Sequence, residues 1–340
     1  MRTPLQGGLP PRGAVVGPVV EIACDESGFS GTNLLRSSAP VITHASVDLS
    51  VDEAVAVITA LRSGFRFAPH EVKSGQFLRR SGAAEALEWF RAALTGRAHV
   101  HLIDKEFFLV TRVVDLLLVE PSYAAGTRLA DEHRPAALAL HAAGRSAGAD
   151  WTAFLAAFVD LVRMKHRLPA QQTVRRFFEA RDVLRRHRLG RPADDVLDGL
   201  DPNRVRAVVA RLDDDDRSIP PPLEPLLPAL AETVLAWSDG RRQVLVTHDE
   251  QSALTADRLT RLRRTLASGP DATPVGALPS GVSPLAGLVM VDSRDDPRVQ
   301  VADLLAGVAR RLPEIIDDAL RQPPPPVAGR DVRRSGLGRP

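Results

Sequence analysis

The sequence predicts an α/β protein in which a layered sheet domain is interrupted by a block of helices. Short apolar, strand-like runs alternate with amphipathic helical patterns towards both ends of the chain, whereas the middle shows helical patterns without a convincing strand. The 340 residues are 44% apolar, which is enough for a sizeable core. The expected divisions are a flexible leader at 1–17, a discontinuous sheet domain at 18–121 and 239–320, a helical insertion at 122–238 and a disordered basic tail at 321–340.

The first strand is expected over 19–24. Because side chains alternate along a strand, Ile22 and Cys24 are placed on one face. Ala23 and Asp25 then face the opposite side. The four remaining strand candidates are 41–47, 99–103, 243–247 and 288–291.

Helix signals separate these strands. Ser50 and Glu53 have the spacing of a capping box, and Pro202 follows Asp201 as an N1 proline follows a cap. Around the strands, helices are expected at 51–64, 83–94, 106–119, 252–266 and 296–320. In the insertion they are expected from 150, at 173–189, from 201 and at 223–237.

Composition excludes several classes. No run approaches the ~20 apolar residues of a membrane helix, and no signal-peptide pattern is present, so a cytoplasmic protein without membrane contact is expected. The single Cys24 excludes an intramolecular disulfide and a Cys-based zinc site. We interpret it as a small strand residue in preference to a nucleophile. The absence of P-loop and dinucleotide-binding motifs argues against an NTPase or a dehydrogenase.

Carboxylates recur where the predicted strands end: Asp25, Asp104, Asp249 and Asp292. Open α/β sheets build their sites at the carboxyl ends of strands, so these residues are expected to face one crevice. A fifth carboxylate, Asp303, lies inside the apolar run of the last predicted helix. Asp303 shares a helix face with Gln300 and Gly307, and the glycine is expected to let this helix approach the sheet closely.

Such a cluster suits metal-assisted phosphodiester cleavage. Mg²⁺ and Mn²⁺ prefer oxygen ligands, and a pair of ions roughly 4 Å apart activates water and stabilises the leaving oxygen. Glu71 is a candidate further ligand, and Lys73 a candidate phosphate contact.

Each carboxylate also has a structural interpretation. Asp25 is suited to capping a turn, and Asp249 to capping the helix that follows it. Structural roles are favoured for three others: Asp104 at an ordinary strand end, Asp292 in a turn and Glu71 as a solvated charge. Asp303 resists this interpretation, because an unpaired carboxylate within an apolar face is costly.

Two basic features are assigned to structure. His99 and His101 share a strand face but lack a third ligand at a suitable spacing, so core positions are favoured over a zinc site. Net charge is only +2, and nearly all basic residues are arginine. A solvated face is therefore favoured over a phosphate-binding surface for one arginine-rich helix, which carries Arg175, Arg176, Arg185, Arg186, Arg188 and Arg191.

Taken together, these motifs resemble those of the domain-of-unknown-function 3800 family. The family pattern corresponds here to Asp-Glu-Ser-Gly at 25–28, Glu-x-Lys at 71–73, His-Asp-Glu at 248–250, Asp-Ser at 292–293 and Gln-x-Ala-Asp-Leu-x-Ala-Gly at 300–307. The first and last motifs are fairly specific as a pair, and the middle ones are weak alone. The resemblance covers about 19–120 and 240–312 and does not include the insertion.

This resemblance implies a ribonuclease H-like fold with a mixed sheet, and a nuclease dependent on Mg²⁺ or Mn²⁺. It implies that Asp25 and Asp303 are the first and last metal ligands. The third acid stays open among Glu71, Asp104 and Asp249. Supporting roles fall to Glu26, Ser27, Asp292 and Gln300, with Gln300 orienting a ligand or substrate.

Two other functions stay open beside a nuclease acting on DNA or RNA. One is a scaffold of the same fold, without catalysis, whose acids are structural and whose insertion binds a protein or nucleic acid. The other is a phosphoryl hydrolase that acts on a small molecule.

Overall fold

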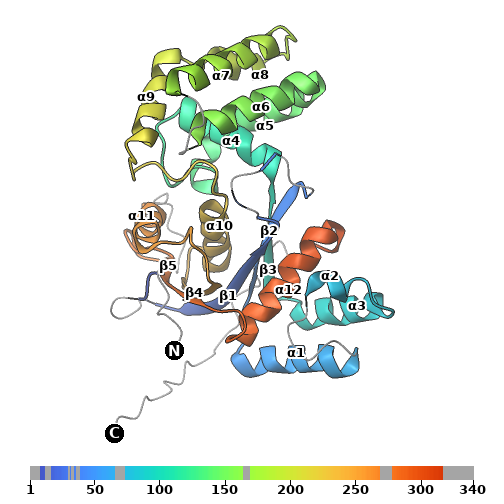
Figure 1. Ribbon diagram of the computed structural model, residues 1–340. Coiled ribbons are helices and arrows are strands. Elements are labelled where there is room, and N and C mark those ends of the chain that lie inside the picture. Colours follow the sequence, from blue (N-terminus) through green and yellow to red (C-terminus); the bar gives the residue numbers. More distant parts are fainter. Residues whose placement is uncertain are drawn as a thin grey trace.

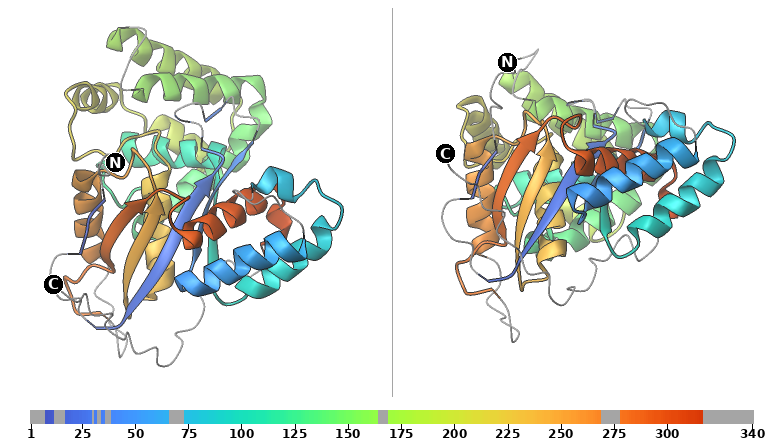
Figure 2. Two further views of the ribbon diagram at one scale, coloured as in Figure 1. Left: turned by 60° about the horizontal axis from the view of Figure 1, so that its bottom comes forward. Right: turned by 90° about the horizontal axis from the view of Figure 1, so that it is seen from below.

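Five strands form one mixed sheet in the computed structural model, which describes residues 8–11, 17–29, 31, 34–35, 39–65, 73–163, 169–268 and 278–316. The strand order is β3-β2-β1-β4-β5. The strands are β1 (Val19–Ser27), β2 (Val41–Val47), β3 (Ala98–Asp104), β4 (Gln243–Asp249) and β5 (Leu285–Val291). Helices cover both faces of the sheet (Figures 1 and 2).

The direction of the strands brings several chain segments to one edge. β2 is antiparallel to β1 and β3, whereas β1, β4 and β5 are parallel. The carboxyl ends of β1, β4 and β5 therefore meet at the same edge of the sheet. This mixed sheet flanked by helices confirms the predicted α/β class and is consistent with a ribonuclease H-like arrangement.

The helices of the described residues follow the predicted order, with additions. They are α1 (Val51–Gly64), α2 (Ser74–Phe77), α3 (Ala83–Leu94), α4 (Lys105–Leu117), α5 (Arg134–Gly144), α6 (Ala149–Val162), α7 (Ala170–Arg185), α8 (Ala193–Asp198), α9 (Pro202–Asp213), α10 (Leu226–Ser238), α11 (Ala256–Ala267) and α12 (Pro297–Arg311). Short 3₁₀ turns are η1 (Arg128–His133), η2 (Arg145–Ala147) and η3 (Pro313–Ile315). None of the described helices is both long and apolar enough to span a membrane.

The predicted alternation along β1 is confirmed by its two packing partners. Ala23 is buried in a cluster with apolar residues of α1, α3 and α12. Ile22 and Cys24 are buried on the opposite face with residues of α10 and α11. Asp25 follows the parity of Ala23, so its side chain lies on the α12 face.

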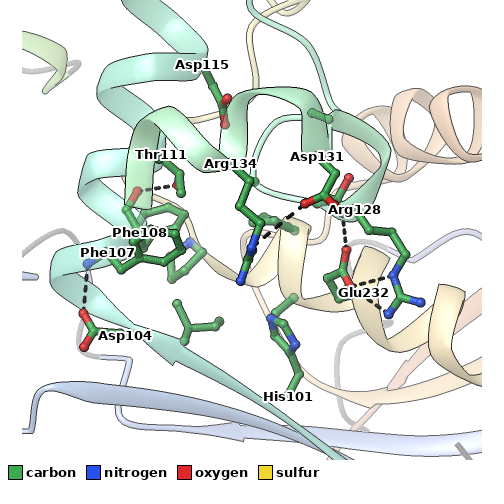
Figure 3. A pocket seen from close by; sticks show the side chains of 18 of the residues that line it. His101, Asp104, Phe107, Phe108, Thr111, Asp115, Arg128, Asp131, Arg134 and Glu232 are labelled. Atoms are coloured by element: carbon green, nitrogen blue, oxygen red, sulfur yellow. Dashed lines mark hydrogen bonds and ion pairs between the residues drawn. The ribbon is translucent and has the colours of Figure 1, made fainter. Parts of the chain in front are cut away.

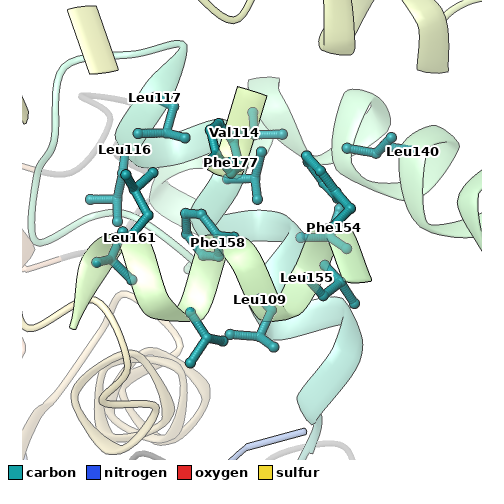
Figure 4. Close-up of a cluster of buried hydrophobic side chains, with 14 of the residues drawn as sticks. Leu109, Val114, Leu116, Leu117, Leu140, Phe154, Leu155, Phe158, Leu161 and Phe177 are labelled. Atoms are coloured by element: carbon teal, nitrogen blue, oxygen red, sulfur yellow. The ribbon is translucent and has the colours of Figure 1, made fainter. Parts of the chain in front are cut away.

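A third cluster joins the remaining helices into a layer beside the sheet. Leu109, Phe154, Phe158 and Phe177 are buried in it, and come from α4, α6 and α7 (Figure 4). The packing does not follow the expected boundaries of the insertion. α4 packs with the insertion helices, whereas α10, expected within the insertion, packs on the sheet with β1, β4 and β5.

Several element ends differ from the expected ones. β1 continues through Ser27 instead of ending at Cys24, because β2 pairs with it as far as Thr43. α12 ends at Arg311 and not near 320, since Pro313 offers no N–H for a further helical turn. Most of the expected leader and all of the expected tail lie outside the described residues.

At Gly307, α12 packs closely against α2. A Cβ on Gly307 would lie 2.2 Å from Ser74 Oγ and 2.6 Å from Ser74 Cβ, but 3.9 Å from Ser27 Oγ on the sheet. The predicted close approach at this glycine is therefore to α2. The sheet contacts α12 one residue earlier, where Thr43 Oγ1 donates a hydrogen bond to the Ala306 carbonyl at 2.7 Å.

We expect Gly307→Ala to lower the free energy of unfolding by about 1–3 kcal/mol, because the added methyl group overlaps Ser74. Urea denaturation measures the change. Gly64→Ala is the control, because a Cβ there has nothing within 4 Å, and we expect no loss. Equal stability of the two variants would contradict the role of Gly307.

Candidate functional site

Asp25 lies in the interior of the sheet. It is part of β1, between β2 and β4, and its register partner on β2 is Ala45. Only 6% of Asp25 is exposed. Its position within a hydrogen-bonded strand replaces the alternative interpretation of a turn cap.

Four carboxylates gather at this edge of the sheet. Asp25 and Glu26 come from β1, Asp249 from the end of β4 and Asp303 from α12. Burial, followed by the nearby charges of Glu26, Asp303 and Asp249 in that order, raises the pKa of Asp25 to about 9. Two of the predicted site acids, Asp249 and Asp303, are thus close enough to Asp25 to oppose its ionisation.

Two neighbouring acids also have raised pKa values. The pKa of Glu26 rises to about 7, through burial and then through the charges of Asp249 and Glu224. The pKa of Asp249 is also raised, mainly by burial. The cluster therefore holds protons near neutral pH or needs a cation to compensate its charge.

Backbone and side-chain donors orient these carboxylates. The Glu26 amide donates to Asp25 Oδ1 at 2.7 Å, and the Ser293 amide donates to Asp249 Oδ1 at 2.9 Å. Gln251 Nε2 donates to Glu26 Oε1. The second oxygen, Glu26 Oε2, is buried and has no hydrogen-bond partner among the described residues.

The oxygen atoms of this cluster are of the kind that a hard divalent cation prefers as ligands. They are carboxylate oxygens, and one of them is buried without a partner. Among the residues that the structure describes, no three His, Cys, Asp or Glu side chains converge in a ready-made metal geometry. The cluster thus supplies suitable ligands without a preformed triad.

Lys73 is the cation beside the cluster. Its Nζ lies 3.5 Å from Asp303 Oδ2, and its side chain is 55% exposed. The charge of Lys73 partly offsets the rise in the pKa of Asp249 that burial causes. Its predicted companion, Glu71, lies outside the described residues.

Asp104 lies away from the cluster. It pairs in register with Val41, whereas Asp25 pairs with Ala45, so Asp104 is four positions further along the sheet and two strands away. Its side chain accepts a hydrogen bond from the Phe107 amide at 2.8 Å and caps α4. The capping contact agrees with the structural role that the sequence favoured for Asp104.

Asp292 lies in the loop before α12, and Gln300 lies in the first turn of α12. Asp292 accepts hydrogen bonds from the backbone and the side chain of Arg294, as a turn residue does. Its charge contributes to the raised pKa of Asp249. Gln300 Nε2 lies 3.5 Å from the Arg294 carbonyl oxygen, so it contacts the same turn.

His44 and His248 form a buried pair behind Asp249, and no sequence motif indicates His44. His44 Nε2 and His248 Nε2 are 3.1 Å apart, His44 Nδ1 is 2.8 Å from Thr233 Oγ1, and His248 Nδ1 is 2.9 Å from the Asp249 carbonyl. Burial lowers the pKa of both rings, that of His248 to about 4, so both are neutral. The only sequence signal was a histidine within each of two apolar strands.

The hydrogen-bond partners fix the direction of this chain. A carbonyl only accepts, so His248 Nδ1 donates to Asp249 and its Nε2 must accept from His44. His44 Nδ1 then accepts from the Thr233 hydroxyl. The chain Thr233–His44–His248 thus connects α10 through the sheet to the backbone of Asp249.

A separate hollow of about 310 Å³ lies between β3, α4, η1 and α10 (Figure 3). His101 from β3 and Arg134 from α5 point into it, and Phe107 lies on one side. Glu232 forms an ion pair with Arg128 at 2.9 Å on the opposite side. None of the four clustered carboxylates lines this hollow, and no sequence pattern had indicated it.

Comparison of this chain with known protein families, with curated proteins and with solved structures finds no match. Inference about function therefore depends on the residues and geometry described above.

We expect the free energy of unfolding of the metal-free protein to fall as pH rises. The pKa of Asp25 is about 9 in the folded protein, against an ordinary value of 3.8. Between these two pH values, the folded state therefore binds more protons than the unfolded state. Each such group contributes a slope of up to ~1.4 kcal/mol per pH unit. Asp25→Asn removes one of them, so it should give a shallower slope and greater stability than wild type at pH 8.

Urea titrations in EDTA between pH 5 and pH 8.5 measure these slopes, with the exposed Glu88→Gln on α3 as the control. Parallel pH profiles for wild type and Asp25→Asn would contradict the assignment of a strained, protonated cluster.

We expect Thr233→Val to destabilise the protein by about 1–3 kcal/mol, since it leaves His44 Nδ1 buried without a donor. Thr173→Val is the matched control, because this buried threonine donates only to the Ala170 carbonyl at the start of its own helix. Urea denaturation compares the two. Equal losses of stability in the two variants would contradict a specific contribution of the histidine chain.

Proposed function

We propose that this protein is a nuclease that hydrolyses phosphodiester bonds with the help of Mg²⁺ or Mn²⁺. The observation that carries the proposal is the cluster of Asp25, Glu26, Asp249 and Asp303, in which burial and then the neighbouring charges raise the pKa of Asp25 to about 9. A protein rarely holds several carboxylates together in a buried site unless a cation or a reaction uses them.

Asp25, Asp249 and Asp303 are the residues that would hold the metal, and Asp249 is our choice for the third acid. It lies on the strand next to Asp25, whereas Asp104 caps a helix elsewhere. When bound, divalent ions supply charge stabilisation and water activation for phosphodiester hydrolysis. The chain's own groups contribute orientation: Ser293 holds one oxygen of Asp249, and the histidine chain holds its backbone.

Lys73 supports a phosphate-containing substrate. Its side chain is half exposed beside Asp303, and its positive charge would attract a phosphate group at the cluster. The resemblance to the domain-of-unknown-function 3800 family points to the same chemistry and the same lysine.

A scaffold without catalysis is the second candidate. The observation that favours it is the lack of three converging ligand side chains in the described part of the chain. Calorimetric titration with Mn²⁺ separates the two functions. Binding with proton release supports the metal site, because protonated carboxylates must ionise to coordinate, and no binding at millimolar Mn²⁺ supports the scaffold.

We expect wild-type protein to cleave labelled DNA or RNA in the presence of Mn²⁺. Asp25→Asn and Asp303→Asn should each lower the rate by at least about a hundredfold, because each removes a charged ligand. Gel assays on single-stranded and double-stranded substrates measure the rate, with Glu88→Gln as the control.

Small phosphate esters are tested beside the polynucleotides. Turnover of the esters alone would reassign the site to a small-molecule phosphoryl hydrolase. Equal rates in wild type and both Asp variants would contradict the proposal.

A further inference from the structure

Arg310 lies on the same side of α12 as Asp303. The two residues are seven positions apart, which places them on one helix face about 10 Å apart along the axis. Arg310 Nε donates to Ser27 Oγ at 3.0 Å, and Ser27 is two residues after Asp25 on β1. A positive charge is thus anchored to the strand that carries the first carboxylate of the cluster.

Two further guanidinium groups continue this positive charge across α2. Arg311 Nη2 lies 3.1 Å from the position that a Cβ on Gly75 would occupy, and Arg79 Nη2 lies 3.9 Å from the same point. Both side chains are exposed. We call Arg79, Arg310 and Arg311 the arginine surface.

The arginine surface is held together without acidic partners. Among the described residues, no carboxylate lies within ion-pair distance of Arg79, Arg310 or Arg311, whereas Arg298 at the other end of α12 pairs with Asp296 and Glu21 at 2.7 Å each. Burial and then the charge of Arg311 lower the pKa of Arg310. Like charges kept together at a site edge indicate a binding surface for an anion.

The extent of the surface favours a polyanion over a single phosphate. Asp303 and Arg310 are about 10 Å apart along α12, and the arginines extend the charge further across α2. A nucleic-acid strand carries a phosphate every ~3.4 Å along a duplex axis, so a stretch of this length spans several phosphates. Guanidinium groups also match phosphate geometry with paired donors.

The arginine-rich helix noted in the sequence is a weaker candidate. On α7, Arg175 pairs with Glu179 at 3.1 Å and Arg185 pairs with Asp198 at 2.5 Å. Part of its charge is therefore compensated by neighbouring acids, as on a solvated face.

We infer that the arginine surface binds the sugar–phosphate backbone of a polynucleotide and leads it along the end of α12 and across α2 to the carboxylate cluster. This inference rests on the proposed nuclease function for what happens to the strand at the cluster. Binding itself requires neither the metal nor catalysis, so it is tested separately.

The test measures binding of fluorescein-labelled 20-mers by anisotropy in EDTA, between 50 and 200 mM salt. Single-stranded DNA, single-stranded RNA and duplex DNA of one sequence are separate arms. We expect Arg79→Ala/Arg311→Ala to reduce the slope of log K against log salt by about 1.4–1.8, because about 0.7–0.9 is lost per phosphate contact. Affinity at 50 mM salt should fall at least tenfold.

Arg176→Ala/Arg186→Ala is the matched control, since it removes the same charge from two exposed positions, one on α7 and one directly after it. We expect its slope to equal that of wild type. Thermal melts confirm that all variants fold.

Equal slopes for the two double variants, or no binding of any arm by wild type, would overturn the inference. A reduced slope in a protein that never cleaves would keep the arginine surface and reject the nuclease. Cleavage that is unaffected in the Arg79/Arg311 variant, with an unchanged slope, would keep the nuclease and reject the surface.

Discussion

The position of α12 across β1 and β2 is the constraint on which the candidate site depends. One hydrogen bond, from Thr43 on β2 to the Ala306 carbonyl, joins the helix backbone to the sheet. Gly307, the next residue, leaves room for Ser74 of α2. These two contacts and the buried apolar face of α12 orient the helix, and Asp303 lies near enough to Asp25 for its charge to raise the pKa of Asp25. Without this orientation, carboxylates separated by most of the chain would not share one environment.

Electrostatics divides the surroundings of this helix into two zones. Towards its start, Asp303 lies near acids from β1 and β4, and Asp25, Glu26 and Asp249 hold their protons more tightly than free carboxylates do. Towards its end, Arg310 and Arg311 carry positive charge with no acidic partner within ion-pair distance among the described residues. Burial makes the acidic zone costly in isolation, because charge is poorly screened away from water. Such a pairing suits a substrate that is itself negatively charged and that reacts at a cation.

The packing of the helices shows what the sequence pattern does not predict, namely which partner each helix packs against. α4 follows β3 directly and reads as part of the sheet domain, yet Leu109 and its neighbours pack with α6 and α7. α10 reads as part of the insertion, yet it covers the sheet and supplies Thr233 to the histidine chain. Periodicity identifies the apolar face of a helix but not which apolar face it meets, because every core offers the same hydrophobic gain.

The sequence by itself determined the α/β class, the alternation of β1, most of the helices, and the acids Asp25, Asp249 and Asp303 as candidates. These follow from local chemistry: period, caps and charges within apolar runs. The tertiary structure alone decided that Asp249 approaches Asp25 while Asp104 caps a helix, that His44 meets His248, and that three arginines gather beside the cluster. The reason is physical: strand order and register set the distances between residues far apart in sequence, and neither is encoded in any single segment.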